Sequence, residues 1–67
     1  MRILKVKKGD IVRGPGGVDH KVRVWEILAV AEDGSIAIGQ NTRAIRNFRC
    51  PLLLNHPDNF FEMVKEL

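Results

Sequence analysis

Several segments of the first forty residues alternate apolar and polar side chains, which is the pattern of half-buried β-strands. This pattern predicts an edge strand over residues 2–6 and a second strand over residues 10–13, with a turn at Lys8-Gly9-Asp10 between them. Residues 18–31 are rich in β-branched and aromatic side chains and are expected to form one long strand. The chain is therefore predicted to be mainly β.

Within the long strand the hydrophobic positions change parity. One face carries Val18, Val22, Val24, Leu28 and Val30. Glu26 interrupts that face, while Trp25 and Ile27 occupy the other. One extra residue in a strand reverses the facing of every later side chain, so we expect a bend or β-bulge near Trp25.

Turn chemistry predicts a hairpin after this strand. Glu32-Asp33-Gly34 is typical of a tight turn, and residues 35–40 should form the returning strand with Ile36 and Ile38 facing inward. Residues 41–50 fit either a short strand or irregular segment, or a helix capped by Thr42. Pro51 is expected to end either one.

The C-terminal segment has a different period. His56-Pro57-Asp58-Asn59 is typical of a helix start, because proline and an acid favour the first turn. The apolar residues Phe60, Met63, Val64 and Leu67 then follow at helical spacing. A short α-helix is predicted over residues 57–67.

The length of 67 residues allows one domain over 1–67, which buries only about 60% of its unfolded surface. A second copy, a protein partner or a ligand could therefore add stability. MRILKVKK lacks the apolar run of a signal peptide, and no segment is long enough to cross a membrane, so a cytoplasmic protein is expected. Cys50 is the only cysteine, which excludes an internal disulfide and a cysteine-based zinc cluster.

Basic residues fall into two blocks. Residues 1–24 carry a net charge of +5 and residues 41–50 one of +3, whereas residues 25–40 and 51–67 carry −3 and −2. If the fold brings the two blocks together, they form a positive surface suited to phosphates. The alternative is a solvated face that keeps a small protein in solution.

The order of the expected elements resembles the small Src-homology-3-like barrels, and within them the KOW-type modules of ribosomal and transcription-elongation proteins. The resemblance lies in KKGDIV at residues 7–12 and in the acid-glycine hairpin of ILAVAEDGSIAIGQN at residues 27–41. It implies an SH3-like barrel of about five strands, to which the predicted helix would be added. KOW modules also place a glycine in the turn before the second strand, and His20-Lys21-Val22-Arg23 contains none. That departure puts the ribosomal type of RNA binding in doubt, whereas the barrel is compatible with it.

Candidate catalytic and metal-binding groups are few. The loop Arg13-Gly14-Pro15-Gly16-Gly17 lacks the lysine and hydroxyl ending of a P-loop, so a turn between strands is favoured over a phosphate cradle. His20 and His56 have no acid or cysteine at metal-site spacing and are expected to be a strand residue and a helix cap. Cys50 is expected to be a packed thiol. The sequence predicts no enzyme, no metal site and no cofactor.

The chain has no tyrosine and four aromatic residues in all, which provides little for stacking on bases. We therefore predict a small, basic, non-enzymatic protein that contacts the phosphate backbone of DNA or RNA. The candidate contacts are Lys5, Lys7, Lys8, Arg13, Lys21, Arg23, Arg43, Arg46 and Arg49.

The alternative is a protein-interaction or regulatory module, such as a small phage- or plasmid-type regulator. It would act through its barrel surface or through its C-terminal segment, which would dock on its own barrel, on a second copy in a homodimer, or on another protein. The candidate interaction residues are Phe60, Phe61, Met63 and Leu67.

Overall fold

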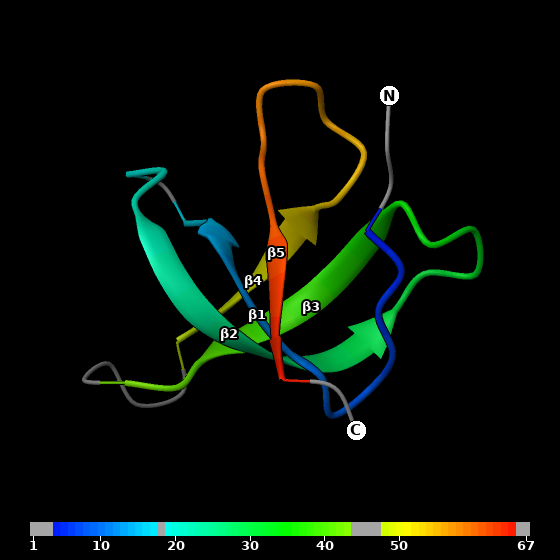
Figure 1. The fold of residues 1–67 in the computed structure, drawn as a ribbon, viewed down its shortest axis with the longest axis horizontal. Helices are drawn as coiled ribbons and strands as arrows, with labels where there is room; N and C mark the ends of the chain where they lie inside the picture. Colours follow the sequence, from blue (N-terminus) through cyan, green and yellow to red (C-terminus); the bar gives the residue numbers. More distant parts are fainter. Residues whose placement is uncertain (1–3, 18, 44–47, 66–67) are drawn as a thin grey trace.

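The computed structural model describes residues 4–17, 19–43 and 48–65 (Figure 1). They form one antiparallel sheet of five strands in the order β4-β3-β2-β1-β5. The strands are β1 (Ile11–Pro15), β2 (Val22–Val30), β3 (Ile36–Asn41), β4 (Arg49–Leu53) and β5 (Glu62–Lys65). The prediction of a mainly β fold is confirmed.

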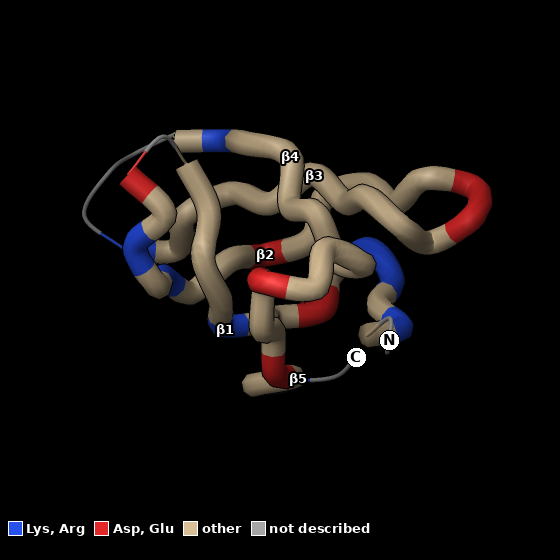
Figure 2. Tube along the Cα trace, turned by 90° about the horizontal axis from the view of Figure 1, so that it is seen from above, with Lys and Arg blue, Asp and Glu red and all other residues tan. Residues whose placement is uncertain are grey.

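The sheet is curled because its longest strand, β2, is bent and pairs with β1 on one side and β3 on the other. Seen from above, β3 and β4 lie on one side of the molecule and β1 and β5 on the other (Figure 2). In the described part of the chain, β4 and β5 are the two edges of the sheet and are not paired with each other. The hydrophobic core lies on the concave side of the sheet, between β3 and β4 on one side and β1 and β5 on the other.

Before its register shift β2 turns Trp25 and Ile27 to the core, and after the shift Val30 packs against the core. Trp25, Ile27 and Val12 are fully buried, whereas Val22 is 65% exposed. The pairing of β2 with β3 shifts register between Ile27 and Ala29, so the predicted bulge exists but lies after Trp25 and not at it. The indole of Trp25 is the largest buried side chain and determines which parity faces inward.

In β3 the predicted facing of the side chains is reversed. Ile36 and Ile38 are each 37% exposed, whereas Ala37 and Gly39 face the core. A Cβ at Gly39 would lie 2.6 Å from Leu52 Cδ1 and 3.1 Å from Trp25 Cβ. Small inward residues are needed in β3 because Trp25 and Leu52 already fill the space opposite.

Both predicted tight turns are confirmed. Gly9 has φ 97°, and the Lys7 N–H donates to Asp10 Oδ2 at 2.9 Å. Gly34 has φ 79°, a backbone conformation that glycine adopts without a steric penalty, and its N–H donates to the Ala31 carbonyl at 2.9 Å.

Two other predictions fail in the described residues. Residues 4–6 form no strand, and the remainder of the predicted strand over residues 2–6 lies outside the described residues. Pro51 does not end an element but lies inside β4, opposite Ile38. Proline is tolerated there because β4 is an edge strand whose outer side needs no ladder hydrogen bonds. Of residues 41–48, Asn41 ends β3, residues 42–43 and 48 are irregular, and 44–47 lie outside the described residues.

The predicted C-terminal helix is wrong over residues 57–65. Residues 57–58 form a turn, and β5 pairs with β1, placing Met63 opposite Val12. Phe61 and Met63 pack against the core while Phe60 and Val64 are exposed, so the segment follows a two-residue period. The spacing of the apolar residues also fits a helix, but the segment forms a strand because it pairs with the free edge of β1. No helix in residues 4–17, 19–43 and 48–65 is long and apolar enough to span a bilayer.

Candidate nucleic-acid interface

Antiparallel pairing brings part of both basic blocks to one end of the sheet, which we call the loop end. Here β1 ends, β2 begins, β3 ends and β4 begins. The segments flanking these strand ends supply the basic residues Lys21, Arg23, Arg43 and Arg49. Figure 2 shows basic segments at this end and the acidic turn between β2 and β3 at the opposite end.

Arg23 is the best-ordered cation of the loop end. Its guanidinium donates to Asp19 Oδ1 and Oδ2, each at 2.7 Å, and to the Gly16 carbonyl at 3.1 Å. It also lies over the Phe48 ring, 5.4 Å from the ring centre. The hydrogen bonds with Arg23 hold the pKa of Asp19 far below its usual value, and Asp19 in turn raises the pKa of Arg23. The side chain is therefore held at the surface in one orientation.

Phe48 connects this cation to the core. Its ring meets the Trp25 ring edge-on, with centroids 5.6 Å apart and planes at 61°. Phe48 is only half-buried, yet one face of its ring is taken by Arg23. The position of Arg23 therefore depends on the same packing that buries Trp25.

The glycine-rich loop is a packing surface for aromatic rings. A Cβ on Gly14 would collide with the Phe61 ring, one on Gly16 would lie 2.6 Å from Trp25 Cζ2, and one on Gly17 would lie 2.9 Å from the Phe48 ring. The Trp25 indole N–H also donates to the Gly14 carbonyl at 3.0 Å.

The preference for a turn over a phosphate cradle stands, and the glycines have a packing role that the sequence did not reveal. His20 lies in the following turn with φ 53° and is exposed, so it is not a strand residue.

Lys21 and Arg43 flank Arg23 and are exposed. The Thr42 N–H donates to the Val24 carbonyl at 3.2 Å, so the chain directly after β3 lies beside the start of β2, and Arg43 follows at this end of the sheet. Arg49 is exposed on the outer face of β4, where its Nε donates to Gln40 Oε1 at 3.0 Å.

The other predicted basic contacts lie elsewhere. Lys5 lines a hollow of about 380 Å³ that also includes Glu32 and Asp33, and Lys7 and Lys8 lead into the neighbouring turn. The fold therefore separates these three lysines from the loop end and places them beside acids.

Arg13 lies on β1 and forms an ion pair with Glu62 of β5, in which both side chains are about half exposed. It is therefore less available to a phosphate than an unpaired arginine. Arg46 lies outside the described residues.

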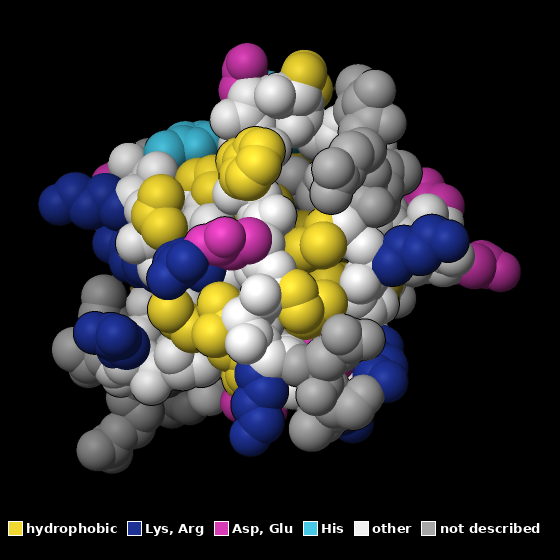
Figure 3. All heavy atoms as spheres, in the orientation of Figure 1, with side chains coloured by type: hydrophobic (Ala, Val, Ile, Leu, Met, Phe, Trp, Pro, Cys, Tyr) yellow, Lys and Arg dark blue, Asp and Glu magenta, His cyan; other side chains and the backbone are white. Residues whose placement is uncertain are grey.

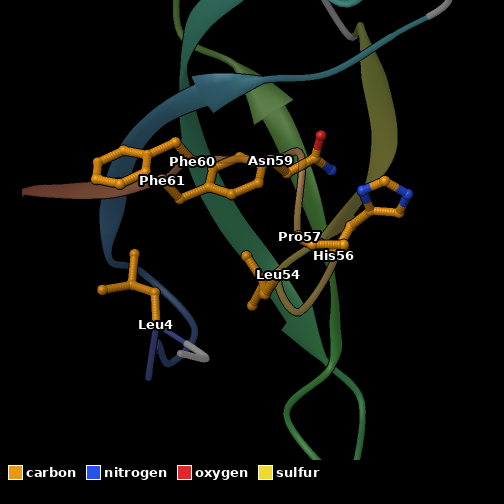
Figure 4. A pocket seen from close by; sticks show the side chains of 7 residues that line it. All are labelled: Leu4, Leu54, His56, Pro57, Asn59, Phe60 and Phe61. Carbon is orange, nitrogen blue, oxygen red and sulfur yellow. The ribbon is translucent and has the colours of Figure 1, made fainter. Parts of the chain in front are cut away.

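The predicted protein-interaction residues also lie in different surroundings. Phe61 and Met63 pack against the core, Phe60 is 84% exposed, and Leu67 lies outside the described residues. Beside Phe60 is a pocket of about 400 Å³ whose lining includes Leu4, Leu54 and Phe61. Figure 4 shows Leu4 and Leu54 on the side of the pocket away from the two phenylalanine rings.

Figure 3 shows this face as a whole, with hydrophobic side chains gathered near its centre and lysine and arginine at its periphery. Sequence periodicity did not reveal the pocket, because its walls come from opposite ends of the chain.

The remaining polar groups form no catalytic or metal-binding set in the described part of the chain. No three histidine, cysteine or acidic side chains there could hold a metal ion. Burial raises the pKa of the Cys50 thiol, which makes it less nucleophilic. His56 caps a turn and not a helix, since its Nδ1 accepts the Asp58 N–H at 3.1 Å.

Comparison with known proteins assigns no relative. No protein-family model matches the chain, and searches of curated proteins and of solved structures found no significant match.

Proposed function

We propose that this protein is a non-enzymatic binder of nucleic-acid phosphate backbone and that its loop end makes the contact. The observation that carries the proposal is the gathering of Lys21, Arg23 and Arg43 at one end of the sheet, from segments that lie about twenty residues apart in the chain. Only one acid, Asp19, belongs to these segments in the described residues. A cluster of cations on one end is the electrostatic pattern expected of a phosphate-binding surface.

The three cations have different parts in the proposed contact. Arg23 is paired with Asp19 and bonded to Gly16, and its side chain is only 18% exposed, so it adds charge to this end and does not itself present a free guanidinium to a phosphate. Lys21 and Arg43 are exposed on either side of it and supply additional charge. Both are able to approach phosphates without displacing any hydrogen bond made by their side chains in the described structure.

Phosphate contact is favoured over base stacking. Phe48 is the aromatic residue nearest these cations, and it is half-buried against Trp25 with Arg23 over its ring. A base would have to displace the guanidinium in order to stack there. We therefore propose little dependence on base sequence and a strong dependence on salt.

The architecture supports a related proposal about the fold family. One curled sheet of five antiparallel strands with a bent β2 is compatible with a small SH3-like barrel. We propose that the chain is a divergent barrel of this kind, with β4 and β5 as its unpaired edges.

The proposed function is tested by titrating the purified protein against duplex DNA, single-stranded DNA and RNA at about 50 and 200 mM salt. Two phosphate contacts, by Lys21 and Arg43, predict a slope of about −2 for log K against log salt with duplex and of about −1.4 with single strands. Absence of binding to all three nucleic acids at the lower salt would refute the proposal.

A second candidate function is the binding of a protein partner through Phe60 and the pocket beside it. Phe60 is the most exposed large hydrophobic side chain in the described structure, at 84%, and it adjoins a largely apolar pocket. These features suit an apolar side chain of a partner, as in a small regulatory protein. Phe60→Ser should abolish co-purification of a specific partner without lowering the melting temperature. Retention of that partner would exclude this surface.

A further inference from the structure

The outer face of β2, β3 and β4 carries an apolar patch that the proposed function does not use. Ile36 of β3 lies opposite Leu53 of β4, and Ile38 lies opposite Pro51. All four side chains are exposed, and on the other side of β3 the exposed Ala29 lies opposite Ile38. Cross-strand neighbours on one face touch, so these residues form one continuous apolar surface.

One polar row borders this patch on the side of the loop end. Glu26 of β2 lies opposite Gln40 of β3, and Gln40 lies opposite Arg49 of β4. Each of the three residues is at least partly exposed, and the row carries an acid at one end, a base at the other and an amide between them. Glu26 and Arg49 form no ion pair within the described residues.

We propose that a second copy of this chain covers the patch, in a symmetric dimer whose two-fold axis runs nearly parallel to β3. Sheets stacked face to face lie about 10 Å apart with strand directions within about 30°. Rotation about such an axis places β2 of one copy over β4 of the other. Glu26 then faces Arg49 of the second copy, Arg49 faces its Glu26, and Ile38 faces Ile38.

Symmetry and charge together select this arrangement. A two-fold interface must be complementary to itself. A row with an acid at one end, an amide in the middle and a base at the other end meets this condition when the two-fold axis is parallel to the strands, because each acid then faces a base. The alternative two-fold axis lies in the interface and is perpendicular to β3. Rotation about it would place the polar row of one copy against apolar residues of the other copy. Glu26 and Arg49 would then lose water without gaining a partner, which is unfavourable.

The dimer has a consequence for nucleic-acid binding. Because the axis runs along β3, the loop ends of both copies point the same way, and two sets of Lys21, Arg23 and Arg43 form one extended cationic surface. Two linked sites bind one strand with an avidity greater than either alone. This doubling rests on the proposed function, whereas the dimer itself does not.

The experiment is a charge-exchange series followed by sedimentation equilibrium without nucleic acid. The wild type should be a dimer at about 100 μM, a range typical of small interfaces. Glu26→Arg and Arg49→Glu should each weaken association at least tenfold, because like charges then meet across the axis. The combined Glu26→Arg/Arg49→Glu protein should recover dimerisation, since the pair is restored with its signs exchanged.

Folding of every variant is checked by near-UV circular dichroism of Trp25. If a single variant fails to fold, Ile38→Ser provides a neutral substitution in the same patch and should also yield a monomer. A monomeric wild type up to 1 mM, about the weakest association of interest, would overturn the proposal. So would a dimer that neither charge reversal weakens. Because these masses are measured without nucleic acid, they are independent of whether the loop end binds phosphate.

Discussion

The two ends of the sheet carry similar numbers of cations in different surroundings. At the loop end, Lys21, Arg23 and Arg43 come together with Asp19 as the acid of their segments. At the opposite end, which we call the turn end, Lys5 shares a hollow with Glu32 and Asp33 of the β2–β3 turn, and Lys7 and Lys8 follow in the chain that leads into β1. The charge runs look alike in the sequence, but the described segments of the loop end contain one acid, whereas Lys5 at the turn end shares its hollow with two.

The ends also differ in what their glycines do. Gly16 at the loop end gives room to the Trp25 ring, whereas Gly34 at the turn end has no neighbour within 4 Å and is required for its positive φ. Packing of the core thus extends to the surface at the loop end, where Trp25 supports Phe48 and Phe48 lies under Arg23. We infer that Arg23 is a rigid part of the fold.

The largest effect is expected when the packing at the loop end is broken. Gly16→Ala puts a methyl group against Trp25 and Leu52 and should lower the free energy of unfolding by about 2 kcal/mol, or roughly 10 °C in Tm. Gly34→Ala forces a positive φ without any collision and should cost about 1 kcal/mol. Thermal unfolding of both variants compares the two losses of stability. An equal or larger loss for Gly34→Ala would contradict the packing role of Gly16.

A smaller effect is expected when the acid of the loop end is neutralised. Asp19→Asn keeps an oxygen that can accept the Lys21 N–H but removes the negative charge beside Arg23, so nucleic-acid affinity should rise about threefold at low salt. Asp33→Asn changes the net charge by the same amount at the turn end. Fluorescence anisotropy should show a gain for Asp19→Asn alone. Equal gains for both variants would mean that total charge, and not its location, governs binding.

The same acids predict how stability depends on pH. Hydrogen bonds from Arg23 lower the pKa of Asp19, and hydrogen bonds from Ser35 lower that of Asp33. A depressed native pKa means that the unfolded chain binds more protons, so this contribution is complete above pH 4 and is lost as pH falls below it. Urea unfolding between pH 2 and 5 should show a shallower acid dependence for Asp19→Asn than for the wild type. An unchanged dependence would show that the pair with Arg23 does not stabilise the fold.

The smallest effect is expected at the exposed ion pair between β1 and β5. Glu62→Gln removes the negative charge that pairs with Arg13 but keeps an acceptor oxygen, and both side chains are about half exposed, so the loss of stability should stay below about 0.5 kcal/mol. The freed Arg13 should raise nucleic-acid affinity less than Asp19→Asn does. A loss above about 1 kcal/mol would show that this pair holds β5 on the sheet.

Local sequence signals predicted the turns and the strand content, since Gly9 and Gly34 each determine a backbone conformation by themselves. It was harder to predict which side chains of a strand face the core. Ile36 and Ile38 were expected to face inward in β3, but Ala37 and Gly39 face the core because Trp25 and Leu52 fill the space opposite them. The C-terminal stripe fitted two periods, and pairing with β1 decided between them.

The basic character of the candidate site could be predicted from the sequence, but the residues that form it could be predicted only in part. Charge blocks pointed to a cationic surface, yet the sequence could not separate Lys7 from Lys21, because only the antiparallel connections send them to opposite ends. The role of Phe48 under Arg23 also depends on contacts between distant segments. Non-local pairing is the information that a single sequence leaves out.

The most direct test of the central claim compares Lys21→Ala/Arg43→Ala with Lys7→Ala/Lys8→Ala in salt titrations against one duplex DNA. Each double variant removes two exposed positive charges, so the net charge of the two proteins is identical. We expect the loop-end variant to bind about tenfold more weakly and its salt slope to fall by about two, with the turn-end variant close to wild type. Equal losses in both variants, or a larger loss at the turn end, would contradict a phosphate site at the loop end.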